Sequence, residues 1–427
     1  MLSYRGCATF VLIFAGLGFV SRAAQAQTFG VELHNTLMPA SGGMAGTSIA
    51  MPQDLTSAIN GNPASITQFN GTQFMFGGAW AEPTFNMNQS QPIPGPPLPS
   101  LIDPFSAKSS APGLPAGNIG VTQELSAYGL PVTFGIGFVT TSGGFVDFRG
   151  VPASRGTNSG MAIFSLPVTL GVQVTDRLSV GASMAMGIAF FDGPFVGLGG
   201  MTPDYALRGT LGANYRLTDE TTVGAYYQTE QSFRFDNAFL FPGPIPIAAD
   251  INMQLPQNVG FGFANTSLMD GQLLLAVDVI YKNWNATDLY GSVYNDQWVL
   301  QLGAQYTSGR YKLRTGYAWV QNPIDSAPGS NLGGIVEPGG SLAVRYTQGL
   351  LAITGQHRIS GGIGIADVLP GVDMDIMAGG MFRDTEQLGA ATQTSVASYW
   401  LGAGMTWRFG RGSCHSHCDL DGDVCQD

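Results

Sequence analysis

Apolar and small residues alternate along much of this chain with a period of two. From Leu178 to Phe190 every even position is apolar, and the odd positions between them carry only Ser, Gly or Ala. That period predicts a β-strand with one apolar face. The run from Leu166 to Val174 has the same pattern, and the polar residues that follow it supply a turn. The two runs therefore predict a β-hairpin.

The same alternation recurs to residue 409 and predicts about fourteen strands. We place them at 73–85, 119–128, 131–140, 166–174, 178–191, 205–217, 222–235, 251–264, 273–284, 298–307, 311–319, 356–366, 372–383 and 395–409. Long Pro- and Gly-rich connections at 86–118, 192–204, 236–250, 285–297 and 320–352 alternate with short turns. This asymmetry is typical of membrane β-barrels, whose turns are short on one side and whose loops are long on the other. Aromatic residues near strand ends predict interfacial girdles: Tyr281, Trp284, Trp298, Tyr311, Trp319, Trp407 and Phe409.

Charged side chains are scarce for a soluble protein of this length. Lys and Arg number 18 and Asp and Glu 29 among 427 residues, which is 11% of the chain, where a soluble domain has about 25%. A soluble β-sandwich or propeller is the alternative fold, but the low charge and the long strands disfavour it. Beyond the first 26 residues no stretch approaches the ~20 consecutive apolar residues of a membrane-spanning helix. We therefore predict an all-β fold, a monomeric transmembrane antiparallel β-barrel of about 14 strands.

The N-terminus has the features of a secretory signal peptide. Arg5 precedes an apolar stretch at 7–20, and Ala24-Gln25-Ala26 forms a cleavage site, so residues 1–26 are expected to be removed. A secreted barrel belongs in the outer membrane of a Gram-negative type of bacterium, with membrane lipid around it. Two Arg and no acid leave with the signal peptide, which changes the net charge from −11 to −13. This negative charge excludes nucleic acid as a partner, because nucleic-acid binding requires neutralisation of phosphates.

The two flanks of the predicted barrel, at 73–409, differ from it. Residues 27–72 have no period of two and many small residues, so we expect them to form a hatch inside the lumen, which fourteen strands would leave open. Residues 410–427 hold three Cys, two His and several Asp. A disulfide with one leftover thiol is the first interpretation of this tail. A transition-metal site is the weaker one, with Cys414, His415, His417 and Cys418 as its candidate ligands.

Several motifs together resemble the FadL/TodX family of outer-membrane channels for long-chain fatty acids and other hydrophobic compounds. The clearest match is a small-residue run from Gly43, followed by Asp54 and then Asn62-Pro63-Ala64. Further segments follow in the family's order: 166–170, 178–182, 224–230, 255–256 with Trp284, and 314–317 with Pro323. The resemblance covers residues 27–409, whereas the family usually ends at the aromatic residue of its last strand.

The resemblance implies passive uptake of a hydrophobic compound, most of all a long-chain fatty acid. External loops would capture the ligand, the hatch would move, and the ligand would leave sideways through the barrel wall. Asn62, Pro63, Ala64, Gly43 and Asp54 are then the hatch residues, with the Asn62 amide as a latch to the wall or as a simple turn residue. The family's lateral opening corresponds to 131–140, where Gly135 and Gly137 could break the strand ladder or simply allow close packing.

A fatty acid also needs a partner for its carboxylate. Lys282, Arg314 and Arg234 have the parity of lumen-facing residues and could donate charge-assisted hydrogen bonds, or they could pair with lumen acids such as Asp278. No cofactor is expected. An enzyme is disfavoured, because His357 near a wall Ser lacks a supporting motif and the glycines at 362–364 lack the rest of a dinucleotide fingerprint. The alternatives within transport are a channel for aromatic or alkane hydrocarbons and a polar diffusion porin.

Overall fold

The computed structural model describes residues 32, 34–95, 98–193, 202–241, 247–332, 335–336, 340–351 and 355–409. The predicted signal peptide at 1–26 and the predicted tail at 410–427, with Cys414, His415, His417 and Cys418, lie outside these residues. No helix in the described part of the chain is long and apolar enough to cross a membrane.

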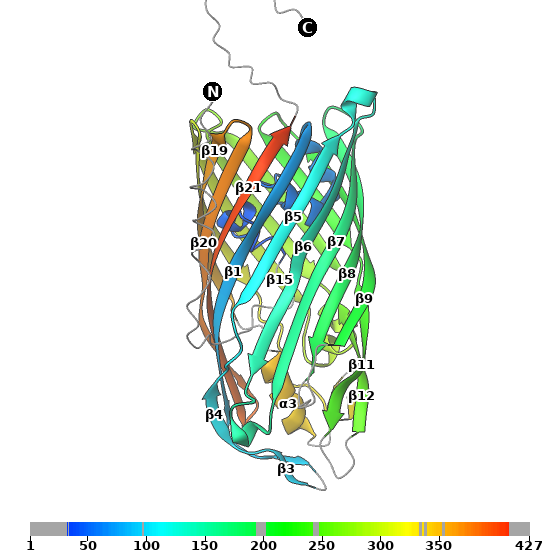
Figure 1. Ribbon diagram of the computed structural model, residues 1–427, viewed down its shortest axis with the longest axis vertical. Helices are drawn as coiled ribbons and strands as arrows, with labels where there is room; N and C mark the ends of the chain where they lie inside the picture. Colours follow the sequence, from blue (N-terminus) through cyan, green and yellow to red (C-terminus); the bar gives the residue numbers. More distant parts are fainter. Residues whose placement is uncertain are drawn as a thin grey trace, which may run out of the picture.

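Fourteen antiparallel strands form a closed barrel (Figure 1). They are β1 (Thr72–Gln89), β5 (Leu114–Glu124), β6 (Val132–Asp147), β7 (Asn158–Gln173), β8 (Leu178–Asp192), β9 (Thr202–Arg216), β10 (Thr221–Gln228), β13 (Asn258–Leu268), β14 (Leu273–Lys282), β15 (Gln297–Ser308), β16 (Tyr311–Val320), β19 (His357–Leu369), β20 (Val372–Leu388) and β21 (Thr392–Phe409). The last strand closes the ring on the first, from Thr72 opposite Phe409 to Gln89 opposite Thr392. Closure leaves every wall strand with two neighbours, and the predicted barrel of 14 strands is confirmed.

Two predicted strands run past the point where the wall ends. Residues 222–235 divide into β10 and β11 (Gln231–Phe241), and residues 251–264 divide into β12 (Ile247–Leu255) and β13. Strands β11 and β12 pair with each other in a separate two-stranded sheet. The alternation of polar and apolar residues continues through this departure, because β11 and β12 also bury one face. Periodicity therefore cannot mark the residue at which a strand leaves the wall.

The connections differ in length at the two ends of the barrel. One end has only short turns, and we call the other the long-loop end. It carries β2 (Ile93–Gly95), β3 (Leu98–Ile102) and β4 (Phe105–Lys108), the β11–β12 hairpin, and the segment with β17 (Asn331–Leu332), β18 (Ile335–Val336) and α3 (Ser341–Leu350). Helix α3 lies within the outline of the barrel at the long-loop end (Figure 1). Its buried side chains contact those of β1 and β20, so the helix partly fills the lumen.

Residues 34–70, which we call the inner segment, lie inside the barrel (Figure 1). They form a 3-10 helix at Ser41–Met44, α2 at Leu55–Asn60 and a 3-10 helix at Pro63–Gln68, and most of them are buried. Asp54 holds the segment together, because its carboxylate accepts hydrogen bonds from the backbone N–H groups of Ala40, Ser41 and Ser57. It thereby caps the N-terminus of α2. The segment packs as a small folded unit against the wall.

A ring of wall glycines accommodates this unit. Twelve of the fourteen strands carry a Gly at which an added Cβ would lie 3.3 Å or less from an atom of the inner segment. These are Gly77, Gly120, Gly135, Gly171, Gly181, Gly212, Gly224, Gly262, Gly303, Gly316, Gly362 and Gly404. At Gly316 the nearest atoms are backbone atoms, Ala45 N and Met44 C, both at 2.3 Å. These 12 of the chain's 60 glycines therefore let the inner segment approach the wall closely.

Apolar side chains fill the lumen between the inner segment and the loops. Two clusters make up what we call the loop-side core, and they include Phe85, Phe148, Tyr346, Met381 and Trp400 on one side and Met161, Phe233, Phe235, Met253, Trp284, Tyr290 and Tyr294 on the other. Trp284 is fully buried there, so its predicted place in an outer aromatic girdle is wrong. Trp284 comes two residues after the end of β14, in a connection that turns into the lumen. Trp298, Tyr311 and Phe409 are about half exposed on the outside, as predicted.

Candidate functional site

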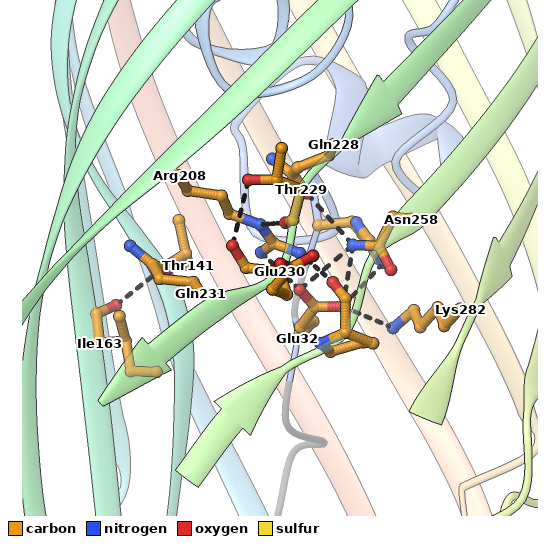
Figure 2. Close-up of polar contacts among 12 residues, drawn as sticks. Glu32, Thr141, Ile163, Arg208, Gln228, Thr229, Glu230, Gln231, Asn258 and Lys282 are labelled. Atoms are coloured by element: carbon orange, nitrogen blue, oxygen red, sulfur yellow. Dashed lines mark hydrogen bonds and ion pairs between the residues drawn. The ribbon is translucent and has the colours of Figure 1, made fainter. Parts of the chain in front are cut away.

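A carboxylate is held by three wall residues at the base of the loop-side core (Figure 2). Glu32 Oε1 accepts a hydrogen bond of 2.7 Å from Arg208 Nη1. Asn258 Nδ2 lies 3.2 Å from both Glu32 oxygens, and Lys282 Nζ lies 3.6 Å from Oε2. All four residues are buried. We call this group the Glu32 cluster.

The strand ends around the departing hairpin position the cluster. Asn258 is the first residue of β13 and Lys282 the last of β14, and the two are direct partners in the ladder. Arg208 of β9 donates through Nε to the Thr229 carbonyl and through Nη2 to the Pro256 carbonyl. These carbonyls flank the β11–β12 hairpin, where the regular ladder stops. Arg208 thus satisfies backbone groups that the departure of the hairpin would leave unpaired.

The electrostatics of the cluster favour an ionised Glu32. Burial raises the pKa of Glu32, but the positive charges of Arg208 and Lys282 outweigh that effect and lower the pKa to about 2. Burial lowers the pKa of His34 to about 3, with a further contribution from Lys282, so this imidazole is neutral at neutral pH. Arg358 of β19 is also buried and acts electrostatically on His34. The cluster is therefore a predominantly cationic site that one carboxylate occupies.

The cluster lies at a boundary between polar and apolar surroundings. Beyond Lys282 the chain continues into Trp284, whose ring packs edge-on against Tyr290 with centroids 5.1 Å apart. Tyr290 donates to the sulfur of Met253 at 3.2 Å and stacks on Tyr294. On the other side, the lining of a cavity of about 50 Å³ includes Glu32, Arg208 and residues of the inner segment. A cavity of this size is far smaller than a ligand pocket of ~300–1,000 Å³, so the polar side of the boundary has no room for a ligand in this conformation.

Polar contacts join the inner segment to the wall. Asn62 Nδ2 donates to Asn214 Oδ1 of β9 at 2.7 Å and, within the inner segment, to the Ile49 carbonyl at 2.9 Å. Asn62 Oδ1 caps the following 3-10 helix. Asp278 of β14 accepts from the backbone N–H groups of Ser48 and Ile49 at 2.6 and 3.0 Å. Strand β14 is one of the two strands that contribute no Gly to the ring, and it contacts the inner segment through the Asp278 carboxylate instead. Pro63 and Ala64 pack directly on the glycines of β8 and β9.

The structure separates the three predicted ligands for a carboxylate. Lys282 belongs to the Glu32 cluster. Arg314 is buried near the short-turn end, where it pairs with Asp375 at 2.5 Å and Gln305 at 2.7 Å. Arg234 is not in the lumen wall, and that prediction is wrong. It lies exposed on β11, paired with Asp236 and Asp250, because the strand on which its parity was counted has left the barrel.

The predicted break of the ladder is absent at Gly135, whereas Gly137 has a partner on one side only. The pairs between β6 and β7 stop at Ile136 and resume at Val139. Gly135 pairs with Thr122 of β5 and Thr169 of β7, and Gly137 pairs with Gly120 of β5. Both glycines face the inner segment, where a Cβ would meet Ile66 or Ile59. The β5–β6 ladder instead ends at Val139. Next to it the Thr140 hydroxyl bonds the N–H and carbonyl of Gly117, and the register with β7 shifts between Thr140 and Ser142.

Three members of the cluster escaped prediction: Glu32, Arg208 and Asn258. Arg208 lies at a lumen-facing position of the predicted strand 205–217. Its neighbour Leu207 faces outward, so the alternation along the strand could have identified Arg208 as a lumen residue. Glu32 precedes every periodic segment, and no local pattern marks it. His357, considered above as a catalytic residue, contacts the Tyr317 hydroxyl at 2.7 Å on an exposed part of the wall.

Comparisons with known proteins add to this geometry. No family model matches the sequence, and no curated protein matches it either. Among solved structures, the Pseudomonas putida toluene transporter TodX is 17% identical, with a TM-score of 0.64 over 88% of this chain and 99% of that chain. A Pseudomonas aeruginosa FadL homologue is 16% identical, with a TM-score of 0.62 over 91% and 100%. The Ralstonia pickettii toluene transporter TbuX is 16% identical, with a TM-score of 0.60 over 87% and 98%.

The chain has the fold of the FadL/TodX channels. The match extends over nearly the full length of those structures. The FadL/TodX fold is that of outer-membrane transporters, and the family resemblance seen in the motifs is confirmed at the level of the fold.

Proposed function

We propose that the protein is an outer-membrane channel for passive uptake of hydrophobic compounds, most of all long-chain fatty acids. The observation that carries this proposal is the boundary inside the barrel. An apolar loop-side core ends at a buried cationic cluster made of Arg208, Asn258 and Lys282. An acyl chain matches the apolar side of this boundary, and a terminal carboxylate matches the cationic side.

The energetic basis is the transfer of the acyl chain out of water. Each buried CH₂ contributes ~0.8 kcal/mol, so a chain of many carbons gains enough to enter a lumen lined by Phe, Tyr, Trp and Met side chains. Methionine and aromatic side chains can repack around such a chain, because thioethers are flexible and polarisable. The carboxylate then needs charge-assisted donors, and Arg208 and Lys282 supply them. Loop capture at the long-loop end would precede this step.

A sideways exit is the second part of the proposal. The ladder between β5 and β6 stops at Val139, and at Gly117 an added Cβ would meet nothing within 4 Å. Thr141, directly after this interruption, lines the same small cavity as Arg208. A ligand at the cluster could therefore reach the wall interruption once the inner segment, including Asn62, Pro63, Ala64, Gly43 and Asp54, moves aside. An exit into lipid keeps the apolar chain out of water.

Two other transport functions remain to be separated by experiment. A channel for aromatic or alkane hydrocarbons is favoured by the similarity in fold to toluene transporters. A buried cationic cluster has no role in binding a hydrocarbon, which is why we place fatty acids first. A polar diffusion porin is disfavoured, because apolar side chains and the inner segment occupy the lumen within the described residues.

The deciding experiment is uptake by cells that lack their own importer, with and without this gene. Radiolabelled oleate, toluene and a polar sugar are tested in parallel, and surface expression is matched. We expect oleate uptake without entry of the sugar. Uptake of toluene without oleate would replace the fatty-acid assignment by the hydrocarbon one. Entry of the sugar alone would refute a hydrophobic channel.

A further inference from the structure

Glu32 occupies a complete recognition site for a carboxylate. Its two oxygens are bound by a guanidinium, an amide and an ammonium group, which come from β9, β13 and β14 (Figure 2). These three groups are fixed by the wall, whereas Glu32 is the only member from the part of the chain that precedes the inner segment. A carboxylate from another molecule would make the same contacts.

We propose that Glu32 holds the place of the ligand's carboxylate, and that a carboxylate-bearing ligand binds by exchanging with it. This inference rests on the proposed function and adds how the ligand is selected. In the exchange one carboxylate leaves the cluster and another enters, so Arg208 and Lys282 keep a counter-ion throughout. The carboxylate of Glu32, once displaced, frees the N-terminal end of the inner segment from the wall.

The exchange discriminates between acids and neutral compounds. Displacing Glu32 without a replacement would leave Arg208 and Lys282 buried without their counter-ion, which is strongly unfavourable. A hydrocarbon or an alcohol cannot supply that replacement. A ligand shifts a conformational equilibrium only through its differential affinity for the two states, and here the negative charge is the source of the difference. Neutral compounds can therefore bind the loop-side core, but they cannot release Glu32.

A short series of contacts connects Glu32 to the body of the inner segment. Three residues further on, Asn35 Nδ2 donates to the Ser48 hydroxyl at 2.7 Å and to the Ser57 carbonyl at 3.1 Å. Asn35 Oδ1 accepts from Asn60 Nδ2 at 3.0 Å. Ser48 is also one of the two residues whose N–H groups bind Asp278 of the wall. Release of Glu32 thus acts on a residue that ties together the start of the segment, α2 and the contact with β14.

The test measures affinity of the purified full-length protein in detergent for oleate and for oleyl alcohol. The two ligands share the acyl chain and differ in charge. The variants are Glu32→Ala and Glu32→Gln, and the matched control is Glu230→Gln, an exposed acid drawn beside the cluster (Figure 2). Heat-modifiable mobility on gels establishes that each variant has formed its barrel.

We expect both Glu32 variants to bind oleate at least roughly tenfold more tightly, because an internal competitor with charge-assisted hydrogen bonds is gone. Affinity for oleyl alcohol should stay within about twofold of the unaltered protein, and Glu230→Gln should change neither. Unchanged or weaker oleate binding by the Glu32 variants would overturn the exchange, as would an equal change for both ligands. If the unaltered protein binds neither ligand, the proposed function itself fails, which is a separate result from loss of the oleate-specific effect.

Discussion

Substitution of a single ring glycine tests whether the inner segment seals the lumen. In Gly316→Ala the new Cβ would lie 2.3 Å from Ala45 N and Met44 C, where ordinary contact begins at 3.4 Å. Both neighbours are backbone atoms, so the segment has to move back by about 1 Å. That movement stretches two hydrogen bonds of Ala45, from its N–H to the Ser360 hydroxyl at 2.9 Å and from Gln301 to its carbonyl at 2.8 Å.

The magnitude follows from these losses. Overpacking costs about 1–3 kcal/mol, and each weakened hydrogen bond adds about 0.5–1.5 kcal/mol. A total of at least about 2 kcal/mol would raise the fraction of molecules with an unseated segment roughly thirtyfold. We expect this fraction to admit small polar solutes. The assay is influx of a labelled sugar into proteoliposomes that contain equal amounts of folded barrel.

Gly361→Ala is the matched control. Gly361 lies on the neighbouring strand with its open side outward, and an added Cβ there meets its nearest neighbour, the Arg314 carbonyl, at an ordinary 3.4 Å. The control should retain the low sugar influx of the unaltered protein. Equal influx for Gly316→Ala, Gly361→Ala and the unaltered protein would refute the argument that close backbone approach at the ring keeps the lumen closed.

Three further changes probe the latch and the site. Asn62→Ala removes a helix cap and a hydrogen-bond donor to the wall, which should destabilise the seated inner segment by about 2 kcal/mol and raise sugar influx. Asn70→Ala, at an exposed residue, is the control and should leave the influx unchanged. In a Glu32→Gln background, where no internal carboxylate competes, Lys282→Met should reduce oleate uptake roughly tenfold and leave toluene uptake unchanged, with Lys312→Met as the control. Parallel losses of oleate and toluene uptake would contradict a carboxylate site. Oleate affinity should fall between pH 7 and pH 4, because a free carboxylic acid protonates near its ordinary pKa of about 4.3, while the lowered pKa of Glu32, about 2, keeps Glu32 ionised. Stability from the Glu32 pairs is thus fully present above pH 4.5 and is lost progressively as the pH falls from there to about 2. A pH-independent oleate affinity would exclude competition between two carboxylates.

The sequence was informative about the wall and uninformative about most of the site. Alternation at residues such as Met184 and Gly181 reports which way each side chain faces, and the structure places Met184 outside and Gly181 against Pro63. Two roles were considered for the Asn62 amide, a latch to the wall and a turn residue, and the structure shows both: Nδ2 donates to Asn214 of the wall, and Oδ1 caps the following 3-10 helix. Arg234 shows the limit of the same reasoning, because parity is meaningful only while a strand remains in the barrel.

By itself the sequence determined the number of strands, their alternating faces, the unequal connections and the position of a non-periodic segment before the first strand. Each of these is a local property, because a strand's pattern reflects the surroundings of its own two faces. The tertiary structure alone decided the Glu32 cluster, whose Glu32 and Arg208 are 176 residues apart in the chain. It also decided where β11 leaves the wall and that Trp284 turns inward. These features depend on closure of the ring and on the depth at which the inner segment sits, and no short-range pattern of side chains encodes either one.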